Sequence, residues 1–259
     1  MRQLTCISRR VAAVRRTFLL VSAVAAIAFA HVVPAVANNA EPVQAPAAQA
    51  VLSADPPLDR FESDVRSFEV QDNLNPPAPG GTLFIGSSTF ALARQLIEAK
   101  FKDFHAIDRA FGGSTIPEIN HYFDRVVARY KPVEICFYAG TNDIANGHSG
   151  KRVFDDFVEF VRKAQSELPQ TDIYFVSMSV APSRLQLAHE YEIGNNLVRR
   201  FAQQNAHVHY VDVTSVMHDK QGHLHAEWFR QDRLHMTERG YAAWIPILRQ
   251  ALRQSHHFN

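Results

Sequence analysis

Residues 133–143 read Val-Glu-Ile-Cys-Phe-Tyr-Ala-Gly-Thr-Asn-Asp, and this stretch decides the fold. The run from Val133 to Ala139 is mostly apolar, which predicts a short strand buried on both faces. The Gly-Thr-Asn-Asp segment after it predicts a turn, and a helical pattern follows from Arg152 to Leu168. A buried strand followed by a helix is the repeating unit of parallel α/β sheets.

The same alternation extends in both directions along the chain. Further strands are expected over 82–86, 105–107, 172–178 and 207–213, and further helices over 90–101, 116–130, 187–205 and 238–253. The fold class is therefore α/β. We predict a single doubly wound domain whose five-stranded parallel sheet lies between helices. In such sheets ligands bind beyond the carboxyl ends of the strands.

The N-terminal 37 residues have the pattern of a signal peptide. Five arginines and no acidic residue accompany an apolar stretch over 18–33, and Ala35-Val36-Ala37 is a small-x-small cleavage site. We expect export to the periplasm or beyond, by the Sec or the twin-arginine route (Arg15-Arg16), although an uncleaved anchor is the alternative. Residues 38–57 read as a flexible Ala/Pro-rich linker, and 58–259 as the domain, which begins with a short helix.

Charge and cysteine content exclude some classes of protein. Removal of the signal takes away five arginines, which leaves 22 of the 27 basic residues against 26 acidic residues. The mature chain therefore carries a net charge of about −4, which argues against a nucleic-acid partner. Cys6 lies in the signal, which leaves Cys136 without a disulfide partner within the chain. No stable membrane insertion is expected after cleavage, and the oligomeric state stays open.

Polar or glycine-rich segments follow the first three strands. Gly86-Ser87-Ser88-Thr89 can project a serine hydroxyl from a strand-to-helix turn, although either serine can also be a helix cap. Phe111-Gly112-Gly113-Ser114 lets the backbone approach a ligand, or is an ordinary loop. The Asn142 amide could donate to an oxyanion, or could belong to a turn.

A fourth segment, Asp232-Arg-Leu-His235, lies just before the last helix. A carboxylate three residues before a histidine can fix the tautomer of the imidazole and stabilise its cation, as a hydroxyl nucleophile requires of its base. Taken alone, the pair could equally be surface residues or a helix cap.

These four segments, in this order, resemble the SGNH subgroup of GDSL-type esterases and lipases. The resemblance covers roughly residues 82–252. It implies a flavodoxin-like SGNH hydrolase fold with Ser88 as nucleophile, His235 as base and Asp232 as its orienter. It further implies an oxyanion hole formed by the Ser88 N–H, the Gly113 N–H and the Asn142 amide, without a metal or an organic cofactor. Ser87 departs from the family pattern, which usually has aspartate there.

The expected substrate is a small-molecule, glycan or lipid ester. Arg184 follows the fourth strand, and Trp228 and Phe229 precede Asp232, so these three residues are candidates for contacting it. Trp228 and Phe229 could instead be structural, and Arg184 could pair with a surface carboxylate.

Three other classes of protein are alternatives to this family. A standard α/β-hydrolase requires Gly-x-Ser-x-Gly, but position 90 is Phe. A metal-dependent hydrolase could use His207 with His209, or His223 with His225, yet neither pair belongs to a complete ligand set. A non-catalytic ligand-binding or accessory domain of the cell envelope stays the alternative to an enzyme.

Overall fold

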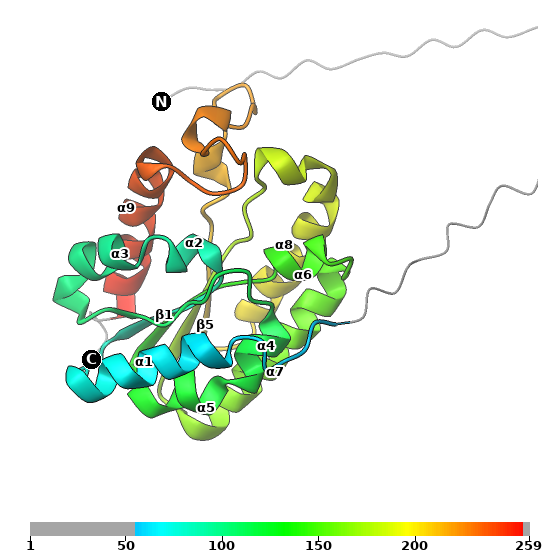
Figure 1. Cartoon of the computed structure of the whole chain (residues 1–259). Helices are drawn as coiled ribbons and strands as arrows, with labels where there is room; N and C mark the ends of the chain where they lie inside the picture. The colour runs from blue at the N-terminus through cyan, green and yellow to red at the C-terminus, as the bar shows by residue number, and fades with distance from the viewer. Residues whose placement is uncertain (1–54, 256–259) are drawn as a thin grey trace, which may run out of the picture. The chain divides into compact units, whose positions relative to one another are not determined.

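The computed structural model describes residues 55–255, so the signal peptide predicted over 1–37 and most of the predicted linker lie outside the described residues. Five parallel strands form one sheet in the order β2-β1-β3-β4-β5 (Figure 1). This arrangement confirms the predicted α/β fold class, and it is the order typical of flavodoxin-like domains. The strands are β1 Thr82–Gly86, β2 Ile107–Asp108, β3 Glu134–Tyr138, β4 Asp172–Val176 and β5 Val208–Val211.

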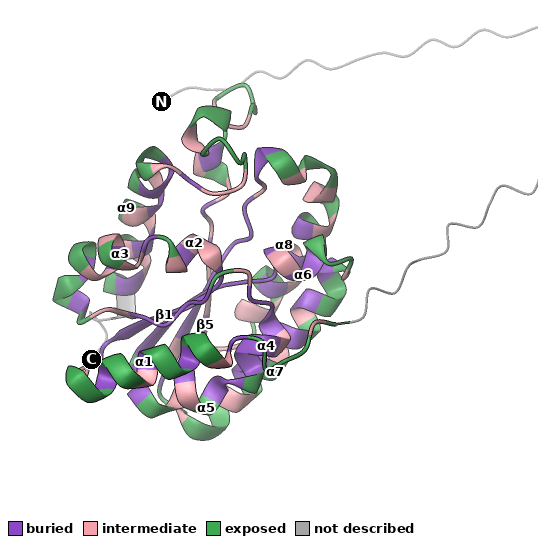
Figure 2. Cartoon of the chain, in the orientation of Figure 1, coloured by how far each residue is buried: buried purple, intermediate pink, exposed green. Residues whose placement is uncertain are grey.

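Alternate side chains of each strand pack into two separate cores. Phe137 of β3 belongs to one core and the adjacent Tyr138 to the other, because successive strand side chains point to opposite faces. The strands lie buried between the two layers of helices (Figure 2). On the Phe137 face lie α1 Glu62–Leu74, α4 Ile116–His121, α5 Phe123–Val126, α6 Thr141–Ala145, α7 Gly150–Glu167 and α8 Ala188–Ala202. On the Tyr138 face lie α2 Ser88–Ala91, α3 Arg94–Lys100 and α9 Glu238–Ser255.

Two helices predicted as continuous are interrupted. The segment 116–130 divides into α4, α5 and the 3-10 turn Ala128–Tyr130. Tyr122 separates α4 from α5, and Val127, which leaves helical geometry at φ −128°, separates α5 from the 3-10 turn. The segment 90–101 divides similarly into α2 and α3 around Ala93. The remaining 3-10 turns cover Lys102–Phe104, Pro182–Leu187, Ser215–Met217 and Ala226–Trp228.

Helix α1 is anchored across the sheet by apolar and polar contacts. Its Val65 and Phe68 enter the core on the Phe137 face, while its buried Asp72 accepts hydrogen bonds from Arg109 and from the Tyr130 hydroxyl. Burial raises the pKa of Tyr130 to about 12, and its hydrogen bond to Asp72 acts in the same direction. Because both partners of Asp72 are buried with it, the register of α1 on the sheet is fixed. None of the helices in residues 55–255 is long and apolar enough to cross a membrane.

Candidate active site

The strand order places the segments after β1 and β3 at the point where the topology of the sheet reverses. β1 has β2 on one side and β3 on the other, and the chain leaves β1 and β3 toward opposite faces of the sheet. A crevice opens at such a point, beyond the carboxyl ends of the strands. Ser88 follows β1 and Asn142 follows β3, so both residues lie at this edge.

Ser88 begins α2 after a turn that requires glycine at position 86. Gly86 has φ +152°, and a Cβ there would lie 2.0 Å from the Tyr138 carbonyl oxygen. The Ser87 N–H donates to that same oxygen at 3.0 Å. Ser87 is buried, whereas Ser88 is only partly covered. Of the two serines, Ser88 is the one that faces the crevice, because it lines both cavities described below.

A continuous line of hydrogen bonds joins Ser88, His235 and Asp232. The Ser88 Oγ lies 3.1 Å from His235 Nε2, and His235 Nδ1 lies 2.8 Å from Asp232 Oδ2. With the ring proton on Nδ1, the imidazole donates to the carboxylate and Nε2 accepts from the serine hydroxyl. This arrangement allows the imidazole to remove a proton from Ser88.

The Asp232–His235 turn is held by its own backbone. Asp232 Oδ1 accepts from the N–H groups of His235 and Leu234, both at 2.9 Å. Hydrogen bonds from the His235 backbone, the His235 side chain and the Leu234 backbone hold the pKa of Asp232 well below its usual range. Arg233 takes a left-handed conformation at φ +57°, and its carbonyl accepts from the Ser183 N–H at 2.9 Å. The turn is thereby tied to the segment after β4.

Asn142 is held on both sides of its amide. Its Nδ2 donates to the Ser114 carbonyl at 3.0 Å, and its Oδ1 accepts from Arg184 Nη2 at 3.1 Å. Arg184 Nη1 also donates to the Thr141 carbonyl at 3.1 Å. The amide carries two N–H bonds, so one N–H remains after the bond to Ser114. Arg184, predicted to contact substrate, therefore also fixes the orientation of Asn142.

The Gly112-Gly113 loop borders the same crevice. A Cβ on Gly112 would lie 4.0 Å from the Ser88 Cβ, and Gly113 has φ +84°, a conformation that favours glycine. The loop is tied down by Arg60, whose Nη2 donates to the Gly113 carbonyl at 2.9 Å. Ser114 Oγ donates to the Gly86 carbonyl at 3.1 Å, which couples this loop to the turn that carries Ser88.

Two cavities of different size meet at Ser88 and His235. One has a volume of about 30 Å³, and its walls include Tyr138, Met217, Phe229 and Trp244. The other is an open groove of about 630 Å³ that is bordered by Gly113 and Asn142. Arg184 contributes to both cavities. Phe229 thus lies where substrate contact was predicted, whereas Trp228 stacks on His225 at 4.1 Å between ring centroids and lines neither cavity.

Helix α1 supplies part of the groove, which the sequence does not indicate. Asp64, Ser67 and Gln71 lie along one stripe of α1 and line the groove together with Ser88. No motif marks these residues, and their distance in sequence from the four segments hides the contact.

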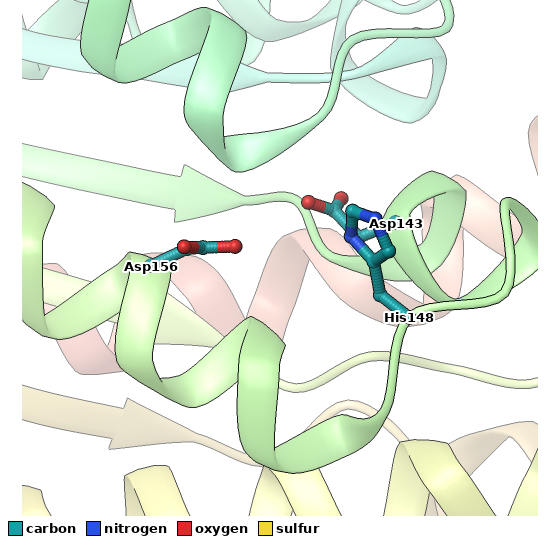
Figure 3. Close-up of side chains that lie close together, drawn as sticks. All are labelled: Asp143, His148 and Asp156. Atoms are coloured by element: carbon teal, nitrogen blue, oxygen red, sulfur yellow. The ribbon is translucent and has the colours of Figure 1, made fainter. Parts of the chain in front are cut away.

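Asp143, His148 and Asp156 are close enough to be considered as metal ligands, and within residues 55–255 they form the one such group (Figure 3). Each has an oxygen or nitrogen within 4.8 Å of the others. Arg152 already bonds Asp156 at 2.9 Å, and Asp55 lies 2.6 Å from His148 Nε2. Burial raises the pKa of Asp143 to about 7. A proton on Asp143 would therefore neutralise the buried carboxyl without a metal ion.

The histidine pairs considered as metal ligands lie elsewhere. His207 and His209 both contact Asp172 Oδ1 at 3.1 Å. Asp172 is the first residue of β4, so this group lies at the edge of the sheet opposite Ser88. His223 pairs with Asp219 at 3.2 Å, and His225 pairs with Glu227 at 2.9 Å.

Comparison with known proteins identifies the class and then the family. A serine hydrogen-bonded to a histidine that is itself paired with an aspartate is the arrangement found in serine hydrolases on several unrelated folds. The profile of the GDSL-like Lipase/Acylhydrolase family matches residues 84–243, and the chain belongs to that family. This result confirms the predicted resemblance at the level of the family. None of the curated protein sequences matches the chain.

Solved structures share the fold at low sequence identity. A candidate acylhydrolase from Bacteroides fragilis is 23% identical with a TM-score of 0.63, and the match covers 80% of this chain and 98% of that one. A GDSL-like lipase from Bacteroides thetaiotaomicron is 18% identical with a TM-score of 0.63 and coverage of 74% and 98%. A mutant acetyl-xylooligosaccharide esterase from Geobacillus is 14% identical with a TM-score of 0.53 and coverage of 66% and 94%.

Proposed function

We propose that this acylhydrolase is an exported serine esterase in which Ser88 is the nucleophile. The observation that carries the proposal is the hydrogen-bonded line from Asp232 through His235 to Ser88, with distances of 2.8 and 3.1 Å. The correspondence of Gly86-Ser87-Ser88 with the family's Gly-Asp-Ser belongs to the same proposal. Export rests on the sequence pattern of residues 1–37.

The mechanism follows from these positions. His235 Nε2 takes the proton of Ser88 as its Oγ attacks the ester carbonyl, and the imidazolium returns a proton to the leaving alcohol. Asp232 stays ionised and stabilises the imidazolium, in keeping with its lowered pKa. Water then attacks the acyl-enzyme with His235 as base. The net reaction converts one ester and one water into one carboxylic acid and one alcohol.

The negative charge that develops on the carbonyl oxygen requires donors already in place. We assign this role to the N–H groups of Ser88 and Gly113 and to the second N–H of Asn142. Asn142 is suited to it because Arg184 and the Ser114 carbonyl hold both ends of its amide. A donor held in this way requires little reorganisation during the reaction.

The two cavities suggest which part of the ester lies where. The acyl group stays on Ser88 while alcohol leaves and water enters, so the open groove suits the alcohol and the smaller cavity suits the acyl group. A volume of about 30 Å³ exceeds the roughly 10–15 Å³ that one water requires, and it suits a methyl or ethyl group rather than a long chain. We therefore propose acetyl and other short acyl esters. The Geobacillus neighbour, named for acetylated xylooligosaccharides, is consistent with this choice.

A panel of p-nitrophenyl esters tests both parts of the proposal. We expect kcat/KM to fall steeply from acetate through butyrate to octanoate, and Ser88→Ala to abolish turnover of all three while the variant remains folded by circular dichroism. Equal turnover of octanoate would refute the short-acyl assignment alone. Undiminished turnover by Ser88→Ala would refute the nucleophile.

A further inference from the structure

We infer that the exposed stripe of α1 formed by Asp64, Ser67 and Gln71 is the binding site for the alcohol part of the substrate, and that this alcohol is a polyhydroxylated compound such as a sugar. The inference rests on the proposed function, because it takes Ser88 as the point of attack. The stripe lines the same groove as Ser88 and His235. It also precedes residues 84–243, which the family profile matches, so it is an addition to the segment that the profile defines.

The stripe differs from the rest of α1 in its ion pairs. The acidic residues elsewhere on the helix are each paired with an arginine. Glu62 pairs with Arg66 and Arg125, Glu69 pairs with Arg125, and Asp72 pairs with Arg109. The helix has one further acidic residue, Asp64, which forms no ion pair within residues 55–255. It is the acid that faces the groove. Its acceptor oxygens are therefore available to a ligand.

The neighbours of Asp64 on the stripe offer complementary hydrogen-bonding groups. Residues 64, 67 and 71 share one face because their spacing matches the helical repeat. The exposed amide of Gln71 can donate and accept. Ser67 Oγ donates to the Ser63 carbonyl at 2.8 Å and keeps its acceptor capacity. Such a mixed set suits hydroxyl groups, which both donate and accept.

Next to the stripe, part of the groove wall is apolar. Ala91, the last residue of α2, and Leu92, which follows it and is 47% exposed, line the groove. Phe68 and Phe111 also line the groove. A pyranose ring has a matching division, with C–H groups on its faces and hydroxyls around its rim. The groove volume of about 630 Å³ lies in the range of small-ligand sites.

Two other kinds of alcohol fit this lining less well. A fatty alcohol would cover the carboxylate of Asp64 and the amide of Gln71 without offering them hydrogen-bond partners, at a cost in binding. A phosphate-bearing headgroup would meet the carboxylate of Asp64. Two arginines also line the groove, and both already donate to other groups. Arg94 donates to the Ala110 carbonyl at 2.8 Å, and Arg184 donates to Asn142 Oδ1 and to the Thr141 carbonyl, both at 3.1 Å. On the stripe itself the one charged group is the Asp64 carboxylate, which favours a neutral polyol over a phosphate.

The test compares two acetyl esters with different alcohols. Monoacetylated xylobiose carries free hydroxyls that can reach the stripe, whereas p-nitrophenyl acetate carries none. We expect Gln71→Ala to lower kcat/KM for the xylobiose ester about 10-fold, and Asp64→Ala/Gln71→Ala to lower it about 10²-fold, through lost hydrogen bonds. Turnover of p-nitrophenyl acetate should change less than about 2-fold.

Asn73→Ala is the matched control, because it removes an exposed amide from the same helix at a position that does not line the groove. The inference is overturned if Gln71→Ala and Asn73→Ala affect the xylobiose ester equally. It is also overturned if the wild type prefers acetyl esters of long-chain alcohols to the xylobiose ester. Absence of any Ser88-dependent turnover would instead refute the proposed function, so the two failures are distinguishable.

Discussion

The two halves of the candidate site are built in different ways. Ser88 and Asn142 follow buried strands and are tied to the sheet by hydrogen bonds, such as that from Ser87 N–H to the Tyr138 carbonyl. Asp232 and His235 lie in the long connection between β5 and α9, where Asp232 is 46% exposed and the regular structure is limited to short 3-10 turns. The groups that would attack and bind the oxyanion are thus fixed by the core, whereas the base is oriented by a local turn.

The largest expected effect is on the half that carries the base. Asp232→Asn should lower kcat by about 10⁴-fold, because an amide favours the wrong tautomer of the imidazole. The measurement is kcat for p-nitrophenyl acetate across pH, with circular dichroism to show that the variant stays folded. A loss of less than about 10-fold would mean that the turn orients His235 without the carboxylate.

On the strand-end half, Asn142→Ala should lower kcat by about 10²- to 10³-fold, as expected for loss of one oxyanion donor. KM for a short ester should change little, because the donor acts mainly on charge that develops in the transition state. Steady-state kinetics separates the two parameters. A raised KM with unchanged kcat would move Asn142 from the oxyanion hole to ground-state binding.

A smaller effect is expected at Arg184, which lies between the two halves. Arg184→Met removes the hydrogen bonds to Asn142 Oδ1 and to the Thr141 carbonyl, and we expect kcat to fall about 10-fold. The same substitution in an Asn142→Ala background should have little further effect, because the group that Arg184 positions is absent. Additive losses in the double variant would show that Arg184 acts on the substrate independently.

The smallest effect is expected at Asp143, the buried residue that follows Asn142 in α6. The pKa of this carboxyl is raised to about 7 by burial, so its contribution to stability is present at pH below its ordinary value near 4 and is lost as pH rises through about 7. Asp143→Asn keeps an acceptor for the Ile116 N–H and removes this titration. Urea unfolding from pH 4 to 8 should show the wild type losing stability relative to the variant. Parallel curves would contradict the raised pKa.

The sheet and the order of its segments could be predicted because both are local properties of the sequence. Buried apolar runs such as 133–139 mark strands, and parallel strands place the residues that follow them at one edge. The resemblance to the family then implied a role in the site for each of these residues.

The partners of these residues could not be predicted in the same way. Arg184 bonds an amide 42 positions earlier, and α1 reaches the groove although no motif marks it. Such contacts depend on how helices pack against the sheet, which one sequence does not encode in any short pattern. The break at Val127 is not marked by a short pattern either, because the apolar spacing that predicted the helix continues through this buried residue.

Covalent labelling of Ser88 tests the central claim most directly. A fluorophosphonate reacts with a serine only when a base activates its hydroxyl, so intact mass and peptide mapping should find one adduct, on Ser88, in the wild type. Labelling should be absent in Ser88→Ala and strongly slowed in His235→Ala, while Ser87→Ala, the adjacent-serine control, still labels. An adduct on another residue, or none in the folded wild type, would contradict the account.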